Sequence, residues 1–139
     1  MHRIPLALLL AVICFKSTAS INFPNKFTIV DSLIERNQID SAVIYLDEIG
    51  KQIRNEKNSI LKLAYFHRYA GLQKLTGNFK SMRLYYDSIS NILPNVKPQT
   101  VADSMLVARG YLSAGTLLGE QNKYFEAIEK YQKAILYSE

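Results

Sequence analysis

Apolar side chains recur along this chain at intervals of three and four residues, the spacing that places them on one face of an α-helix. The final segment shows the spacing most clearly, with apolar residues at Tyr124, Ala127, Ile128, Tyr131, Ala134 and Ile135. Five segments of the same kind precede it, separated by short turns near Asn37, Gly77 and Asn122 and by connections around residues 51–58 and 95–99. The pattern predicts an all-α chain.

Cap and turn residues divide the predicted helices into pairs. Asn58 and Thr100 are placed to cap helix starts, and Asp103 would complete a capping box with Thr100. Gly77 suits the left-handed position that follows a helix, and Pro94 cannot continue one. The three expected hairpins cover approximately residues 25–53, 59–94 and 100–138.

The first residues have the organisation of a secretory signal peptide. Residues 1–3 include a basic lead, residues 4–15 are mainly apolar, and residues 17–20 are small. A helix of about 12 residues would be roughly 18 Å long, short of the ~30 Å hydrocarbon core of a bilayer. We expect a signal peptide over residues 1–19 that is cleaved after Ala19, so that the chain meets the membrane only during export. An uncleaved membrane anchor is the alternative.

Cleavage would also remove the single cysteine, Cys14, and part of the positive charge. The 139-residue chain has a net charge of +5. Loss of Arg3 and Lys16 leaves 15 basic and 12 acidic residues, a net charge of +3, over 139 − 19 = 120 residues. This small, scattered excess argues against nucleic acid as a partner. Lipidation of Cys14 is a further alternative, although Ile13 is bulkier than the small residue that usually precedes such a cysteine.

Small and aromatic residues in the last hairpin stand where two helices would cross closely. They are Tyr111, Ala114, Gly115, Leu118, Ala127, Tyr131 and Ala134. Their order resembles the tetratricopeptide repeat, whose pattern combines aromatic residues and a Leu-Gly pair with later Ala, Phe and Pro. Residues 105–138 match this repeat pattern well, and residues 22–139 as a whole match it loosely. The residues after each turn, Ile39, Phe79 and Tyr124, lie 40 and 45 positions apart, against a consensus of about 34. A generic all-α bundle is the alternative for the first hairpin.

The resemblance implies an α-solenoid of three stacked hairpins, with partners bound along the concave surface that the first helix of each hairpin forms. By register, that surface would carry Phe27, Asp31 and Glu35, then His67, Gly71 and Lys74, then Leu112, Thr116 and Glu120. These residues do not reproduce the Lys, Asn and Arg set that holds acidic carboxyl-terminal peptides in the best-known members. We expect a scaffold that binds a protein or peptide partner in the periplasm or cell envelope of a bacterium.

Constellations for catalysis, metals or cofactors are not apparent in the sequence. After the expected cleavage site, His67 is the only histidine and no cysteine remains, so a zinc site lacks ligands. We expect His67 to be a hydrogen-bonding group at the surface. Gly110, Gly115 and Gly119 lie within one predicted helix rather than in a phosphate-binding loop, and we expect them to allow close helix contact. The sequence therefore predicts no enzyme activity.

Side chains that suggest other chemistry have structural explanations. Tyr86, Tyr111, Tyr124 and Tyr131 fall on predicted packing faces, so we expect them in the core rather than in a sugar-binding site. The carboxylates of residues 47–48 diverge by about 100° on a helix, and we expect a solvated face there.

Two other functions fit the same pattern. Exported arrays of long tetratricopeptide-like repeats resemble the sensory regions of some bacterial histidine kinases and helix-turn-helix transcriptional regulators, and this chain would then be a truncated piece of one. The third hypothesis is an accessory protein for glycan capture or envelope assembly. In each case Ile135, Leu136 and Tyr137 lack a following helix to cover them, so we expect self-association through this end.

Overall fold

The computed structural model describes residues 22–139, which form six α-helices and no β-strand. The helices are α1 (Phe23–Glu35), α2 (Ile39–Ile53), α3 (Ser59–Leu75), α4 (Phe79–Ile92), α5 (Val101–Glu120) and α6 (Tyr124–Ser138), with a 3-10 turn, η2 (Leu93–Asn95), after α4. The predicted all-α class is confirmed over this range. No helix in it combines the length and apolar character needed to cross a bilayer. The expected signal peptide and Cys14 lie outside the described residues.

Three turns of the same conformation join the helices in pairs. The central residue of each turn is left-handed: Asn37 with φ 58°, Gly77 with φ 73° and Asn122 with φ 60°. The next amide then donates a hydrogen bond to the carbonyl five positions back. These bonds are Gln38 N to Leu33 O, Asn78 N to Gln73 O and Lys123 N to Leu118 O, each 2.8–2.9 Å long. This is the Schellman arrangement, which ends one helix and reverses the chain into the next.

Local side-chain caps fix where two of the longer helices begin. The Asn58 amide oxygen accepts a bond of 2.9 Å from Ile60 N at the start of α3. At α5, Thr100 Oγ1 accepts from Asp103 N at 3.1 Å, and the Asp103 carboxylate accepts from Thr100 N at 3.1 Å. The predicted capping box is therefore confirmed, with aspartate in the place usually held by glutamate or glutamine.

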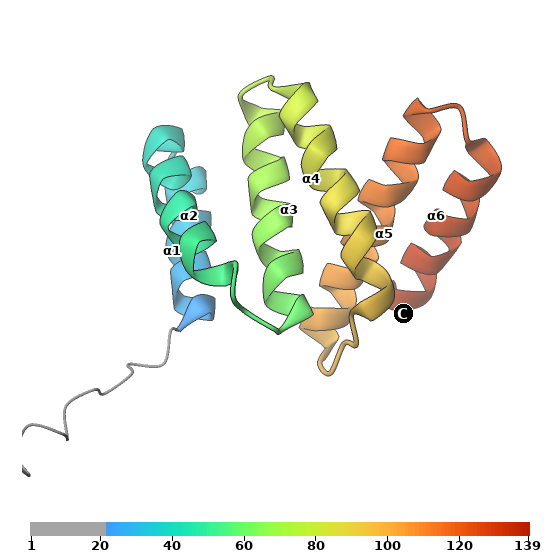
Figure 1. Cartoon of the computed structure of the whole chain (residues 1–139), viewed down its shortest axis with the longest axis horizontal. Coiled ribbons are helices and arrows are strands. Elements are labelled where there is room, and N and C mark those ends of the chain that lie inside the picture. The colour runs from blue at the N-terminus through green and yellow to red at the C-terminus, as the bar shows by residue number, and fades with distance from the viewer. Residues whose placement is uncertain (1–21) are drawn as a thin grey trace, which may run out of the picture.

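The helix pairs follow one another in chain order across the molecule (Figure 1). Helices α1 and α2 both contact α3, and α3 and α4 both contact α5. The most extensive contact is between α5 and α6. Two apolar clusters result, one around Val30, Leu46, Ile49 and Leu72 and the other around Leu63, Ile89, Leu93 and Val107. The first helix of the second and third pairs is thus covered on two sides.

Two glycines of α5 allow neighbouring side chains to lie against its backbone. A Cβ added to Gly110 would lie 2.8 Å from Leu93 Cδ2, and one added to Gly115 would lie 2.5 Å from Tyr131 Cε1. The prediction of close contact is confirmed at these two positions. It is wrong for Gly119, where no atom lies within 4 Å because no neighbouring element covers that side of α5.

The outer side of α6 is more exposed than its apolar periodicity predicts. Tyr124, Ile128 and Ile135 are 61%, 51% and 60% exposed, whereas Ala127 and Ala134 are buried. The expected core position of Tyr124 is therefore wrong, while that of Tyr111 is confirmed. The reason is that α6 makes extensive contact with α5 alone, so only a narrow side of it is buried.

Candidate functional site

The first helices of the three pairs line a common groove with a volume of about 730 Å³. Its walls come from Pro24, Phe27 and Asp31 of α1, from Ile60, Leu61, Ala64, His67 and Arg68 of α3, and from Ala102, Asp103, Met105, Leu106 and Arg109 of α5. Most of these side chains are apolar. The polar groups are concentrated at His67, at the two arginines and at the two aspartates.

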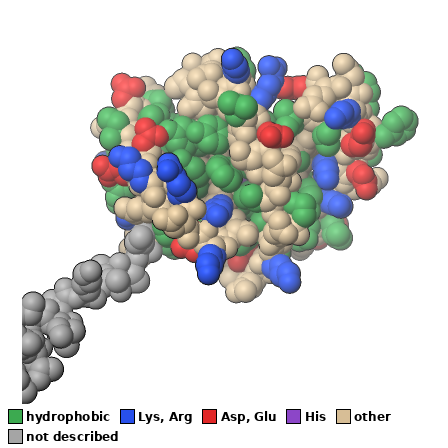
Figure 2. Space-filling model, viewed as in Figure 1, with side chains coloured by type: hydrophobic (Ala, Val, Ile, Leu, Met, Phe, Trp, Pro, Cys, Tyr) green, Lys and Arg blue, Asp and Glu red, His purple; other side chains and the backbone are tan. Residues whose placement is uncertain are grey.

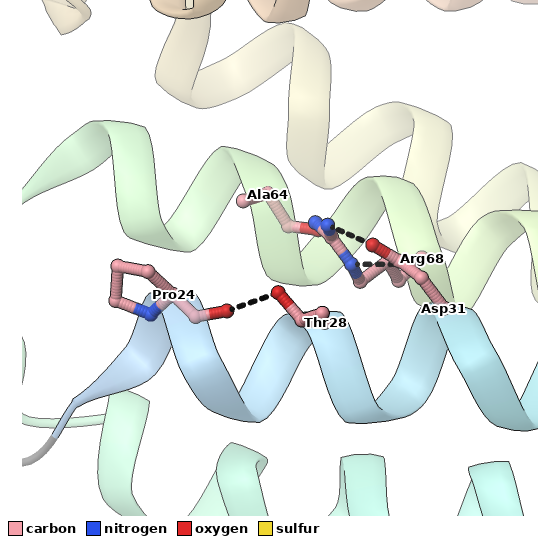
Figure 3. Close-up of polar contacts among 5 residues, drawn as sticks. All are labelled: Pro24, Thr28, Asp31, Ala64 and Arg68. Atoms are coloured by element: carbon pink, nitrogen blue, oxygen red, sulfur yellow. Dashed lines mark hydrogen bonds and ion pairs between the residues drawn. The ribbon is translucent and has the colours of Figure 1, made fainter.

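Arg68 of α3 joins the first helix pair to the second (Figure 3). Its Nε and Nη2 donate to Oδ1 and Oδ2 of Asp31 at 2.8 and 2.7 Å, a two-bond pairing that matches the fork of the guanidinium to the carboxylate. Nη1 donates to the carbonyl of Ala64 at 3.1 Å. The guanidinium carbon also lies 4.5 Å from the centre of the Phe27 ring, so the aromatic face contributes a cation–π contact.

Local contacts in the first turns of α1 stabilise the segment that meets Arg68. Pro24 lies in the first turn, where a missing amide hydrogen costs no helical bond. One turn later, the hydroxyl of Thr28 donates to the Pro24 carbonyl at 3.0 Å (Figure 3). Phe27 and Asp31 are four residues apart and therefore lie on one side of α1. That side is the one presented to Arg68.

His67 is enclosed in the groove rather than displayed at the surface. Its Nε2 is buried and has no hydrogen-bond partner among residues 22–139. Burial lowers the pKa of His67 from 6.5 to about 4, and the charges of Arg109 and Arg68 add to this effect. The prediction of a hydrogen-bonding surface group is therefore wrong, because α3 is flanked by both α1 and α5. At neutral pH the imidazole is uncharged, and its buried Nε2 remains without a hydrogen-bond partner in the described part of the chain.

Arg109 of α5 carries the uncompensated positive charge of the groove. Its side chain is exposed and makes no hydrogen bond or ion pair with any other residue in the described part of the chain. The charge of Arg68, in contrast, is matched by Asp31. Asp103, the remaining carboxylate of the groove, is engaged in the capping box of α5. Among the charged groups of the groove, Arg109 is therefore best placed to donate hydrogen bonds to an acceptor on a ligand.

The nine residues predicted for the binding surface are distributed over several places. Phe27, Asp31 and His67 line the groove. Leu112 lines a different hollow of about 270 Å³ between α5 and α6. The others, Glu35, Gly71, Lys74, Thr116 and Glu120, are exposed outside the groove. Of these, Glu120 pairs with Arg83 of α4 at 2.6 Å, and the Thr116 hydroxyl donates to the Leu112 carbonyl at 3.0 Å.

Sequence reasoning missed Arg68 and Arg109. Arg68 and Asp31 are 37 positions apart, and no local spacing signals their pairing. Arg109 follows Met105 by one helical turn, a spacing that places it beside the apolar wall but does not distinguish it from other surface arginines. Both residues became apparent only once the packing of α1, α3 and α5 was known.

Within residues 22–139, no group of three His, Cys, Asp or Glu side chains is arranged to hold a metal ion. No protein-family model matches the chain, and neither a curated protein nor a solved structure matches it.

The two-bond contact between Arg68 and Asp31 is expected to add measurable stability. The side chains are 23% and 45% exposed, so solvent screens part of the attraction. In a double-mutant cycle with Arg68→Met and Asp31→Asn, urea unfolding should give a coupling free energy of about 1 kcal/mol. The single-bond pair of Arg83 and Glu120, with side chains 54% and 36% exposed, serves as the control and should couple by less than about 0.5 kcal/mol. Equal coupling in the two cycles would contradict the joining role given to Arg68.

Stability should also depend on the protonation of His67. The unfolded chain takes up this proton near pH 6.5 and the folded chain near pH 4. The free energy of unfolding should therefore be highest above pH 6.5, fall by on the order of 3 kcal/mol as the pH drops to 4, and level off below. Nuclear magnetic resonance titration of the imidazole measures its pKa directly, and His67→Gln should remove this part of the pH dependence. A measured pKa close to 6.5 would show that the ring is not enclosed.

Proposed function

We propose that this chain is a non-enzymatic, tetratricopeptide-like scaffold that binds a protein or peptide partner in the groove of α1, α3 and α5. The observation that carries the proposal is the groove itself, which draws its lining from the first helix of every pair. Its volume of about 730 Å³ is in the range of known binding sites. The signal-peptide pattern of residues 1–19 supports a location in the bacterial cell envelope.

The tetratricopeptide-like part of the proposal is supported by repetition in three dimensions. The left-handed residues of the three turns, Asn37, Gly77 and Asn122, are 40 and 45 positions apart and make equivalent hydrogen bonds. In each of the first two pairs, both helices contact the first helix of the next pair. Such nearest-neighbour packing is how stacked repeats build one continuous core.

A peptide is the ligand that best fits the mixture of groups in the groove. Pro24, Leu61 and Met105, which retain exposed surface, supply apolar contacts along three separate helices. Arg109 offers an unpaired guanidinium, and the neutral imidazole of His67 forms part of the groove wall. An elongated segment with an apolar side chain beside a carbonyl or carboxylate would use all of these groups.

Peptides selected on the full chain by phage display test this function. Binding measured by fluorescence polarisation should weaken by more than about tenfold in Arg109→Glu, because the introduced carboxylate repels the carbonyl or carboxylate oxygen of the peptide. His67→Ala should weaken it less, since the neutral imidazole contributes packing to the groove wall and no charge. Lys123→Glu changes the net charge equally at the turn between α5 and α6, far along α5 from the groove, and should leave affinity within twofold. Selected peptides that bind Arg109→Glu as well as the unaltered chain would refute the groove as the site.

The apolar side of the third pair supports a second proposal, that two copies of the chain associate there. Ile128 and Ile135, 51% and 60% exposed, form a ridge along α6, and Ile135 is also one wall of the hollow of about 270 Å³ whose lining includes Met105, Ala108 and Leu112. A ridge and a hollow on one surface are self-complementary under a two-fold axis, since each copy can insert its ridge into the other.

The ridge is peculiar to the third pair. Counted from the first residue of the second helix in each pair, the positions equivalent to Ile135 are Gly50 and Ser90. Gly50 is small enough for the Tyr65 ring of the next pair to lie against it, as the close approach of the two residues shows. The third pair therefore has a protruding isoleucine at a position where the first pair has the small residue that allows the next pair to pack against it.

Sedimentation velocity over a range of concentrations tests the association. The unaltered chain should shift from monomer to dimer as concentration rises, and Ile135→Asp should remain monomeric because a buried unpaired carboxylate is costly. Leu84→Asp on α4, at a side chain 64% exposed, is the matched control and should dimerise like the unaltered chain. A single monomeric species at every concentration would rule the interface out.

A further inference from the structure

A second hollow lies between α2 and α3, on the side of α3 that faces away from the groove. Its volume is about 600 Å³. The lining comes from Asp47, Gly50, Lys51, Ile53 and Arg54 of the first pair and from Lys62, Tyr65 and Phe66 of α3. On α3 these side chains are separated by about half a turn from Ala64, His67 and Arg68, so the two sites share no residue. We name this hollow the α2–α3 cleft.

The floor of the α2–α3 cleft is aromatic and is held by packing. The Tyr65 ring lies 5.5 Å from the ring centres of both Phe66 and Tyr69, and Tyr69 stacks on Tyr85 at 4.6 Å. The Tyr65 hydroxyl lies so close to Gly50 that a Cβ there would overlap it. Glycine at position 50 therefore lets the ring lie against the backbone of α2.

The rim of the cleft carries three cations and one carboxylate. Lys51, Arg54 and Lys62 make no ion pair with other residues of the range 22–139. The carboxylate, Asp47, is exposed, as expected for a solvated face, and it also accepts a hydrogen bond from the Tyr69 hydroxyl. Figure 2 shows Lys and Arg side chains gathered where α2 ends and α3 begins. The formal charge around the cleft is therefore +2, held by groups that repel one another when it is empty.

A neutral hydrogen-bond donor completes the lining. Burial raises the pKa of the Tyr65 hydroxyl to about 12, helped by Tyr85 and Asp47. This hydroxyl is therefore protonated throughout the physiological range and can donate to an anion. The phenol, three cations and an aromatic floor within one hollow are together complementary to an anionic group attached to a flat apolar ring.

We propose that the α2–α3 cleft binds small molecules in which a dianionic phosphate monoester is carried on an aromatic ring. The formal charge of +2 matches a phosphate monoester above its second pKa of about 6. The ring would lie on the aromatic floor and the phosphate among Lys51, Arg54 and Lys62. A cleft volume of about 600 Å³ is large enough for such a ligand and for a substituent beyond the ring. The site is independent of the peptide groove.

Calorimetric titration of the full chain with phenyl phosphate at pH 7.5 tests the cleft, with inorganic phosphate and benzyl alcohol as separate probes of charge and ring. Phenyl phosphate should bind with one site per chain and more tightly than either fragment. Lys62→Ala and Arg54→Ala should each weaken it by about tenfold, the loss expected for one charge-assisted contact. Lys80→Ala, an exposed lysine of α4 outside the cleft, should change it by less than twofold.

Four results would overturn the proposal. The first is the absence of saturable binding at millimolar phenyl phosphate, and the second is equal weakening of binding by Lys62→Ala and Lys80→Ala. The third is an affinity for inorganic phosphate equal to that for phenyl phosphate. The fourth is an affinity for benzyl alcohol equal to that for phenyl phosphate. Circular dichroism of each variant establishes that the helices are retained. Arg109→Glu should leave phenyl phosphate binding intact while it disrupts the peptide groove, so failure of one site is distinguishable from failure of the other.

Discussion

The arrangement of this chain depends on the burial of α3 and α5 from two sides at once. Each of these helices contacts its own partner and also both helices of the preceding pair. Burial on opposite sides requires apolar or small residues around much of the helix, which explains why α5 buries Val107, Ala108, Gly110, Tyr111, Ser113, Ala114, Gly115 and Leu117. The side chains that remain uncovered on α3 and α5 are then left to line the grooves between pairs.

Polar groups at these junctions combine structure with binding capacity. Arg68 is held by Asp31, Phe27 and the Ala64 carbonyl, so it fixes the position of α1 on α3. Its neighbour His67 is enclosed by the same packing and kept neutral, which leaves a nitrogen without a partner. The rigid contact and the buried, unpartnered nitrogen are adjacent because α3 lies between α1 and α5.

Local features were predictable from the sequence, and features that depend on distant neighbours were not. The capping box of Thr100 and Asp103 and the left-handed Gly77 follow from residues within one turn of each other. The exposure of Tyr124 and the enclosure of His67 depend on which helices lie nearby, and periodicity does not specify that. The ion pair of Arg68 links positions 37 apart and has no local signature. Consequently the class of the fold could be predicted in advance, but only Phe27, Asp31 and His67 of the expected surface line the groove.

The central claim is that α1, α3 and α5 form a single binding surface. Intermolecular nuclear Overhauser effects between the labelled chain and an unlabelled selected peptide measure this directly. The account predicts contacts from the peptide to Pro24, Leu61 and Met105, one on each of the three helices, and none to the exposed side chains of α2, α4 and α6. Contacts confined to Ile128, Ile135 or other outer side chains of α6 would contradict it.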